Sequence, residues 1–565
     1  MLQVISGKFF KTDDRYRNNC KGISYSNYSW VAPIRTCIAT LEPVSTYLPV
    51  SSYVISYVNQ IEKESRGGLG IVQTGNTEII QQFQLLCMFG LKAYFDIDRN
   101  DVELQCRKSP KNNRDDYVPS QYIQRILSTQ IMGNSSEIEY FIKFVEKVID
   151  LPRDKYESVI KYLNNYKCAL QIMSHNVDLS YSILVYCLES LCQDHDRYNP
   201  VWQDYPEDQK SKLDFHLDKI ENKTGAEIRK ILLCERNLKL RKRYIKFIFE
   251  NIDNTFFTTE SEKINNAIRK SELERALQNT YNMRSGFVHQ LKPIMKQLKI
   301  PQINESEVFF WENEPYLTFK GLFRIVQHVL NNFIWKQESV KTEDYDWRNN
   351  LPGIIMVEMV PEYWVAAIKD LKPAMAVKKY SGFLNNLQKA ILTNGGLINL
   401  SVLLEKYEAL IPSSKKKYQI PMLATYCLYN AYIEPKGKRP GYQQFLDKYQ
   451  QLLDECSIEM MIVWMILKQK WDWSVEECVI HYNNYKKKKF KKFFLKIPLY
   501  IELCLIIEIA NIYLRNEKID KYEEWLDYAY LDAAGKTKIQ EIICTHKNKK
   551  DEVDINSILK SKKES

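Results

Sequence analysis

Apolar residues recur every three or four positions along most of this chain. The pattern is clearest in residues 135–193, 211–252 and 260–298, and it returns in residues 380–396, 443–473 and 501–531. Such spacing places apolar side chains on one face of an α-helix, which then packs against its neighbours. We therefore predict a mainly α protein whose helices form bundles.

The first 140 residues show a mixed pattern. Residues 29–50 combine β-branched side chains with prolines, and residues 93–106 predict two short extended pieces around the polar sequence Asp98–Asp101. Between these segments, residues 76–95 open with Asn76 and Thr77, a typical helix start, and continue with apolar residues at helical spacing. This part of the chain is predicted to be a small α+β domain.

Chain length and the changes in pattern divide the protein into domains. With 565 residues, the chain is too long for one compact core. We predict a mixed α+β N-terminal domain at residues 1–140, a central helical domain at residues 141–340 and a helical C-terminal domain at residues 354–565. A polar, aromatic linker, residues 336–353, is expected between the last two domains.

Composition narrows the cellular setting. The N-terminus has no apolar run behind a basic start, and the most apolar segment, residues 497–514, contains Glu502 and Glu508, which are costly in a bilayer. The 13 cysteines include no Cys-x-x-Cys pair, so neither a zinc site nor a disulfide framework is indicated. We expect a cytoplasmic protein with no membrane span, no metal and no other cofactor.

Positive charge is in modest excess. A net charge of +10, from 80 Lys and Arg against 70 Asp and Glu, weakly favours an acidic partner such as RNA. Basic clusters lie at residues 239–247, 413–419, 436–442 and 485–496. A solvated helix face or loop is the commoner explanation of such a cluster. Only the last cluster, which interleaves aromatic residues with six lysines over residues 485–494, has the composition of a nucleic-acid surface.

Most histidines stand alone in the sequence. The chain contains no H-E-x-x-H or G-x-S-x-G motif, which argues against a zinc protease or an α/β-hydrolase. His195 lies among carboxylates, as a metal ligand would, although a polar loop has the same composition. Structural or surface roles are expected for six of the seven histidines: His175, His195, His216, His328, His481 and His546.

The seventh, His289, follows Arg284 and Ser285 closely. Cleavage of RNA without a metal needs a base that takes the proton from a ribose 2′-hydroxyl and an acid that protonates the departing 5′-oxygen. Imidazole can serve in either role near neutral pH. The planar cation of Arg284 can hold the scissile phosphate, and Ser285 can add a hydrogen bond to the phosphate or orient the histidine.

The spacing of these residues sets a geometric condition. Five positions place Arg284 and His289 about 140° apart on a regular helix. Both can reach one phosphate only if the helix is distorted, which Gly286 would permit, or if a second copy of the chain supplies one of them. By spacing alone, an ordinary helix with a surface arginine and a capping or packed histidine is the better explanation.

The context of the motif resembles a known family. The segment Tyr281–Leu291, YNMRSGFVHQL, resembles the R-x(4–6)-H signature of HEPN domains, a helical family of ribonucleases and RNA-binding modules. Residues 162–191 resemble the first long helices of the Apea-like type. In that comparison Glu189 matches the acidic residue of the second helix, which orients the arginine or its neighbours. Ser285 stands where many members have Asn, and Gln290 where Gly is common.

The resemblance, which covers about residues 140–340, implies a function. Catalytic HEPN domains join two motifs in one cleft, so one motif per chain implies a homodimer. Many members are toxins of phage defence that cut RNA in abortive infection, after a phage protein or a partner defence protein triggers them. The resemblance thus implies a metal-independent endoribonuclease with His289 as acid and base and Arg284 as phosphate stabiliser, the flanking domains acting as sensors or RNA-positioning parts.

Two other functions remain open. A non-catalytic HEPN protein, acting as an RNA-binding protein, antitoxin or scaffold, would use the same helix only as a dimer interface. A helical adaptor that binds another protein is a further possibility for the residues after Gly353. Retention of both Arg284 and His289 favours the enzyme.

Overall fold

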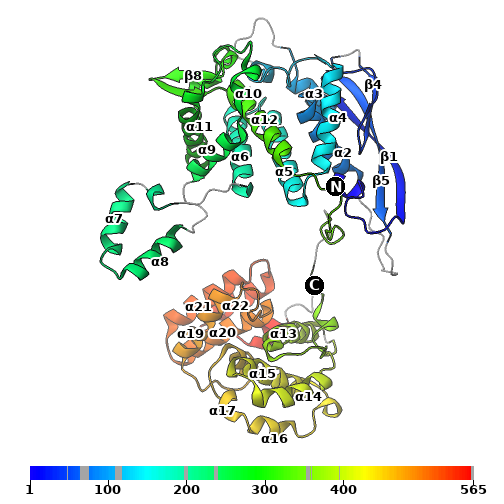
Figure 1. The fold of residues 1–565 in the computed structure, drawn as a ribbon. Helices are drawn as coiled ribbons and strands as arrows, with labels where there is room; N and C mark the ends of the chain where they lie inside the picture. The colour runs from blue at the N-terminus through cyan, green and yellow to red at the C-terminus, as the bar shows by residue number, and fades with distance from the viewer. Residues whose placement is uncertain are drawn as a thin grey trace. The chain divides into compact units, whose positions relative to one another are not determined.

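A computed structural model of the protein describes all residues except 47–48, 64–74, 109–117, 196–200, 206, 234–239, 352–356, 358, 394 and 561–565. The chain forms two compact units, residues 1–354 and 355–565 (Figure 1). Both units are mainly helical, which confirms the fold class expected from the apolar spacing. All strands of the described part lie in the first unit.

An antiparallel five-stranded sheet begins the first unit, in the order β3-β4-β5-β1-β6. The strands are β1 (Arg15–Ser26), β3 (Ile34–Arg35), β4 (Thr40–Ser45), β5 (Ser51–Glu62) and β6 (Phe95–Asp96). The two longest, β1 and β5, pair over their full length, from Arg15 opposite Glu62 to Ser26 opposite Ser51. The first half of β5 alternates between buried and partly exposed side chains, so one face of the sheet belongs to the core.

The sheet and the helices after it share one hydrophobic core. Helix α2 (Asn76–Gly90) is buried at every position from Gln82 to Gly90, because α4 (Ser135–Ile149) and α5 (Arg153–Ile172) also pack against it. The ring of Phe89 on α2 lies 5.6 Å from that of Phe144 on α4. Residues 1–140 and 141–340, which the sequence pattern separated into two domains, therefore form a single unit.

Helix α6 (Val177–His195) is the centre of the helical part of this unit. It pairs with α5 and is covered by α9 (Leu240–Asn251), α11 (Lys270–Gln290) and α12 (Phe319–Lys336). A hairpin of β8 (Val308–Trp311) and β9 (Glu314–Leu317) packs on α11. Other elements of the first unit are α1 (Leu2–Ile5), β2 (Tyr28–Ser29), β7 (Ile131–Met132), α7 (Glu207–Leu217), α8 (Asn222–Leu233) and α10 (Asn254–Phe257).

Residues 93–106 contain one extended piece rather than the two expected. The first is β6, but the second half of the segment is helix α3 (Arg99–Gln105). The side chain of Asp98 accepts a hydrogen bond from the backbone N–H of Asn100 and caps this helix. The polar sequence is thus a helix start and not a turn between strands, since an N-cap aspartate satisfies a donor of the first turn.

The described part of the expected linker, residues 336–351, packs on the first unit. The ring of Tyr345 lies 5.1 Å from that of Phe9, and the guanidinium of Arg348 donates a hydrogen bond of 2.7 Å to the backbone oxygen of Glu62. Trp347 and Leu351 are buried in the same core. The aromatic residues that suggested a linker are therefore core residues, and the boundary between units falls near residue 354.

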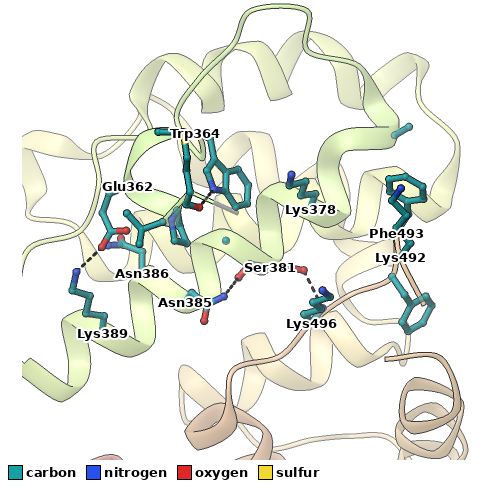
Figure 2. A pocket seen from close by; sticks show the side chains of 16 residues that line it. Glu362, Trp364, Lys378, Ser381, Asn385, Asn386, Lys389, Lys492, Phe493 and Lys496 are labelled. Atoms are coloured by element: carbon teal, nitrogen blue, oxygen red, sulfur yellow. Dashed lines mark hydrogen bonds and ion pairs between the residues drawn. The ribbon is translucent and has the colours of Figure 1, made fainter. Parts of the chain in front are cut away.

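The second unit is built from helices. They are α13 (Ala376–Thr393), α14 (Ser401–Leu410), α15 (Lys416–Tyr432), α16 (Tyr442–Asp447), α17 (Gln450–Leu453), α18 (Ile458–Ile466), α19 (Val475–Lys488), α20 (Leu499–Arg515), α21 (Ile519–Asp532), α22 (Thr537–Lys549) and α23 (Ile555–Lys560). The apolar α20 is central, with Glu502 paired to Lys489 at 2.8 Å. A pocket of about 800 Å³ opens beside α13 (Figure 2). In the described part of the chain, no helix combines the length and the apolar character needed to cross a membrane.

Candidate active site

Helix α11 carries the Arg284–His289 motif on its second half. Its first half is anchored by buried Leu273, Ala276, Leu277 and Thr280, which recur at helical spacing. Burial then decreases, and Val288 and Leu291 at the C-terminal end are 49% and 78% exposed. The motif therefore lies where the helix leaves the core of the unit.

Arg284 points to the neighbouring helix α6. Its Nη2 atom lies 2.7 Å from Oε2 of Glu189, and the two side chains are only 13% and 5% exposed. The guanidinium also lies over the ring of Tyr186, with its carbon 5.7 Å from the ring centre. The Nε atom of Arg284 is buried and has no hydrogen-bond acceptor among the described residues. The arginine is thus held by one carboxylate, with part of its hydrogen-bonding capacity unused.

Glu189 is also held from other sides. Its Oε1 atom accepts hydrogen bonds from the hydroxyl of Tyr281 at 3.4 Å and from the amide of Gln193 at 3.5 Å. Burial, together with the negative charge of Glu189, raises the pKa of Tyr281 to about 12, so this phenol remains a neutral donor at physiological pH. These contacts fix the carboxylate that faces Arg284.

Ser285 and His289 have no such partners. Ser285 is partly exposed and His289 is exposed, and neither side chain forms a hydrogen bond with a residue in the described part of the chain. His289 occupies the last turn of α11, which ends at Gln290. Leu291 follows in the left-handed conformation, with φ of 53°, and its N–H bonds to the carbonyl of Phe287 at 2.9 Å. The imidazole is therefore free to meet a group outside this helix.

A single chain does not provide the distortion that would bring Arg284 and His289 together. Helix α11 is uninterrupted from Lys270 to Gln290, and Gly286 is an ordinary helical residue within it. The two side chains consequently leave the helix about 140° apart. Arg284 lies against α6, while His289 lies at the exposed end.

A basic cluster that sequence alone did not connect with this motif lies beside it. Helix α9 packs on both α6 and α11 and carries Arg241, Lys242 and Arg243. An Nη1 atom of Arg241 donates a hydrogen bond of 3.3 Å to Asn282, two positions before Arg284. The cluster was visible in the sequence, but its position depended on a packing contact between segments about 40 residues apart.

His195 has a structural setting. Its ring stacks on Phe333 with centres 5.0 Å apart, and its Nδ1 atom lies 3.0 Å from Nζ of Lys155. Burial lowers its pKa, so the neutral ring can accept a hydrogen bond from the lysine. No group of three or more His, Cys, Asp or Glu side chains suited to a metal ion occurs among the described residues.

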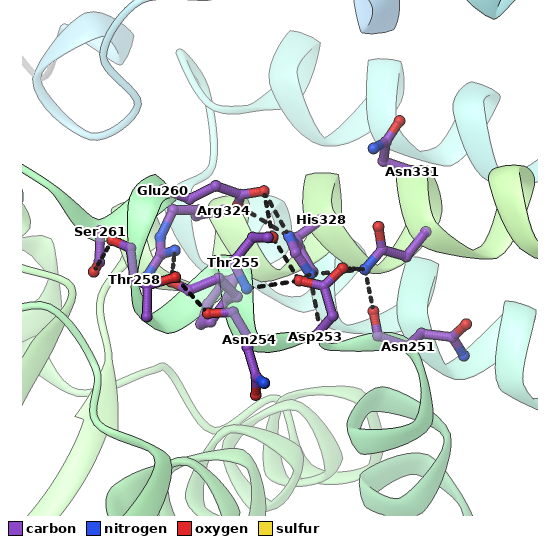
Figure 3. Close-up of polar contacts among 12 residues, drawn as sticks. Asn251, Asp253, Asn254, Thr255, Thr258, Glu260, Ser261, Arg324, His328 and Asn331 are labelled. Atoms are coloured by element: carbon purple, nitrogen blue, oxygen red, sulfur yellow. Dashed lines mark hydrogen bonds and ion pairs between the residues drawn. The ribbon is translucent and has the colours of Figure 1, made fainter.

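His328 is the centre of a second polar cluster (Figure 3). Its Nδ1 atom lies 2.9 Å from Oε2 of Glu260, and its Nε2 atom lies 2.9 Å from the amide nitrogen of Asn332 and 3.4 Å from the backbone nitrogen of Asp253. The hydrogen bond from His328 lowers the pKa of Glu260. Both ring nitrogens are occupied within the fold, so His328 joins α12 to the segment after α9 and is not available as a base.

Comparisons of the chain with protein-family models, with curated proteins and with solved structures found no match.

Proposed function

We propose that the protein is a metal-independent endoribonuclease whose site is built around Arg284 and His289. The single observation that carries the proposal is the contrast between these residues on one helix. Arg284 is positioned by a buried carboxylate with its Nε atom unused, while His289 is exposed at the helix end. A fixed cation and an accessible imidazole are the two kinds of group that phosphodiester cleavage needs.

The proposed reaction uses only side chains of the protein. A base takes the proton of the ribose 2′-hydroxyl as the 2′-oxygen attacks phosphorus, and an acid gives a proton to the 5′-oxygen as its bond to phosphorus breaks. The products are a 2′,3′-cyclic phosphate and a 5′-hydroxyl. In a site shared by two copies, the His289 of one copy acts as base and that of the other as acid. Arg284 offsets charge on the non-bridging oxygens, and Ser285 donates a hydrogen bond to the phosphate. Glu189 is a positioning residue for Arg284.

Geometry favours a site shared by two copies of the chain. Because α11 is regular, Arg284 and His289 of one chain diverge by about 140°. A homodimer would bring the His289 of one copy to the Arg284 of the other. Exposed Val288 and Leu291 next to His289 supply apolar surface for such a contact. The resemblance to HEPN domains extends the proposal to a cytoplasmic RNA-cutting toxin in phage defence, released by a phage protein or a partner defence protein.

One observation favours a non-catalytic alternative. The Arg284–Glu189 pair is largely buried between α11 and α6, and a buried pair of this kind can be retained only to specify how two helices pack. The protein would then be an RNA-binding protein, antitoxin or scaffold of the same family, with His289 as a surface residue.

An RNA cleavage assay separates the two functions. Purified full-length protein is incubated with end-labelled RNA in EDTA, and products are tested for a 2′,3′-cyclic phosphate. We expect His289→Ala to lower the cleavage rate at least 100-fold, whereas His216→Ala, which alters another exposed histidine, leaves it unchanged. Growth arrest on expression, relieved by Arg284→Ala, is the expected companion result. Equal cleavage by wild type and His289→Ala would reject the proposed site.

A further inference from the structure

The pocket beside α13 in the second unit has a basic and aromatic lining. Its volume of about 800 Å³ is within the usual range of ligand sites. The charged residues that line it are four lysines and one glutamate, and the aromatic residues are Trp364, Phe493 and Phe494. The lining includes the end of the lysine-rich segment, residues 485–496, whose composition indicated a nucleic-acid surface. The pocket belongs to the second unit, whereas Arg284 belongs to the first.

The lysines converge from two separate parts of the chain. Lys378 and Lys389 project from α13, while Lys492 and Lys496 come from the segment between α19 and α20 (Figure 2). Lys389 pairs with Glu362 at 2.7 Å. Lys492 and Lys496 are exposed and form no ion pair with a described carboxylate. Their charge is therefore available to an anionic ligand.

Aromatic rings accompany this charge. Phe493 and Phe490 are 84% and 89% exposed, an unusual position for two large apolar rings so close in sequence. The Nζ atom of Lys492 lies 5.5 Å from the ring centre of Phe493, and that of Lys378 lies 4.9 Å from the ring centre of Trp364. Cations next to open ring faces provide both phosphate attraction and stacking surfaces.

The backbone of the segment that carries Trp364 is held in place by hydrogen bonds from a buried lysine. Lys379 is buried, with 3% exposure, and its ammonium donates hydrogen bonds to the backbone oxygens of Trp364 at 2.6 Å, Val365 at 2.9 Å and Ala367 at 2.5 Å. The indole N–H of Trp364 donates to the backbone oxygen of Met359 at 2.7 Å. The pocket therefore has a built wall and is not a gap in a loose loop.

We propose that this pocket binds single-stranded nucleic acid, with Lys492 and Lys496 contacting phosphates and Phe493 stacking on an unpaired base. An acidic peptide would satisfy the lysines but would leave the exposed ring without a role. A duplex would hide its base faces from the ring. The site would hold the strand whether or not the first unit cleaves RNA.

Fluorescence anisotropy with full-length protein tests this site. The probes are fluorescein-labelled 12-nucleotide oligo(dT) and 2′-O-methyl oligo(U), whose sugars lack the attacking hydroxyl and so resist the proposed cleavage. We expect Phe493→Ala to weaken binding about tenfold. We expect the double variant Lys492→Ala/Lys496→Ala to weaken it as well and to lower the slope of log affinity against log salt by about 1.4. Lys415→Ala/Lys417→Ala removes the same charge from another exposed part of the second unit and should have little effect.

Each comparison decides one part of the proposal. Tighter binding of oligo(dT) assigns the pocket to DNA, and tighter binding of oligo(U) assigns it to RNA. Equal losses in the two double-lysine variants would mean non-specific attraction and would overturn the site. A loss of binding with Lys492→Ala/Lys496→Ala but none with Phe493→Ala would overturn base stacking and favour another polyanion. Tighter binding of a third probe, a fluorescein-labelled 12-base-pair DNA duplex, would have the same meaning. Unchanged thermal unfolding of the variants confirms that folding is not the cause.

Discussion

Arg284 of α11 and Glu189 of α6 are 95 positions apart in the sequence, yet an Nη2–Oε2 distance of 2.7 Å joins them in a largely buried ion pair. The pair is at once the link between two helices and the element that would aim the cation of the proposed active site. Changing each partner alone, and then both together, therefore tests whether the pair links the helices.

The first prediction concerns the loss of one partner. Glu189→Ala should lower the free energy of unfolding by about 3 kcal/mol, because it leaves the charge of Arg284 buried and unpaired. The double change Glu189→Leu/Arg284→Met should cost clearly less than the sum of the single changes. Urea unfolding of wild type, Glu189→Leu, Arg284→Met and Glu189→Leu/Arg284→Met measures this coupling. Additive losses would show that the two side chains do not interact in solution.

The second prediction concerns the end of α11. Leu291 is 78% exposed and has a φ of 53°, a conformation that costs a leucine about 1–2 kcal/mol. Leu291→Gly should raise the free energy of unfolding by about 0.5–1 kcal/mol. This gain is smaller than the strain that is relieved, because glycine has a larger conformational entropy than leucine in the unfolded chain.

Gln290→Gly is the matched control for that change. Gln290 is the last residue of the helix and has no positive φ, so glycine there relieves no strain and should destabilise by up to about 1 kcal/mol, the cost within a helix. A stabilised Leu291→Gly protein with weaker self-association would also indicate that Leu291 lies in a dimer contact. Destabilisation by Leu291→Gly at concentrations where the protein is monomeric would contradict the strain argument.

The third prediction concerns pH and Lys379. Burial, reinforced by the charge of Lys378, lowers the pKa of Lys379 to about 8 from the ordinary 10.5. Between these values the unfolded chain binds a proton that the folded chain has released, so the stability of the protein should rise as pH increases from about 8 to 10.5. Lys379→Met should remove this contribution.

Lys406→Met provides the control, because it removes an exposed lysine of the same unit and retains both Lys379 and its neighbour Lys378. Chemical denaturation at pH 7.5, 9 and 10.5 gives the slope for each protein. Identical slopes in Lys379→Met and wild type would show that Lys379 is not the titrating group.

The helices of this protein could be predicted from sequence because their signal is local. Residues 135–193 repeat an apolar face every turn, and no distant partner is needed to recognise it. Strand β1 could not be recognised in this way. Its first residues, Arg15–Asn19, are largely polar and exposed, so they show no alternation of apolar and polar positions. Its pairing with β5 is a long-range contact, which such a pattern would be needed to predict.

The candidate site was predictable only in part. The motif residues of α11 are contiguous, and the resemblance to HEPN helices pointed to Glu189 as a neighbour of Arg284. The approach of Arg241 on α9 and the hydroxyl of Tyr281 to this site depends on helix packing, which a one-dimensional pattern does not contain. The pocket beside α13 likewise joins segments more than 100 positions apart.

Residues 336–351 connect the sheet of the first unit to its helices. Arg348 binds the end of β5 through Glu62, while the carboxylate of Glu343 accepts a 2.9 Å hydrogen bond from the backbone N–H of Arg153 at the start of α5. Residues 336–351 therefore join the N-terminal sheet to the helical part of the same compact unit, which also holds Arg284. A molecule that docks on the sheet could therefore affect the Arg284 site only by a strain transmitted through this common core. A chain that ends at residue 335 would lose these connecting contacts while retaining every residue of the motif.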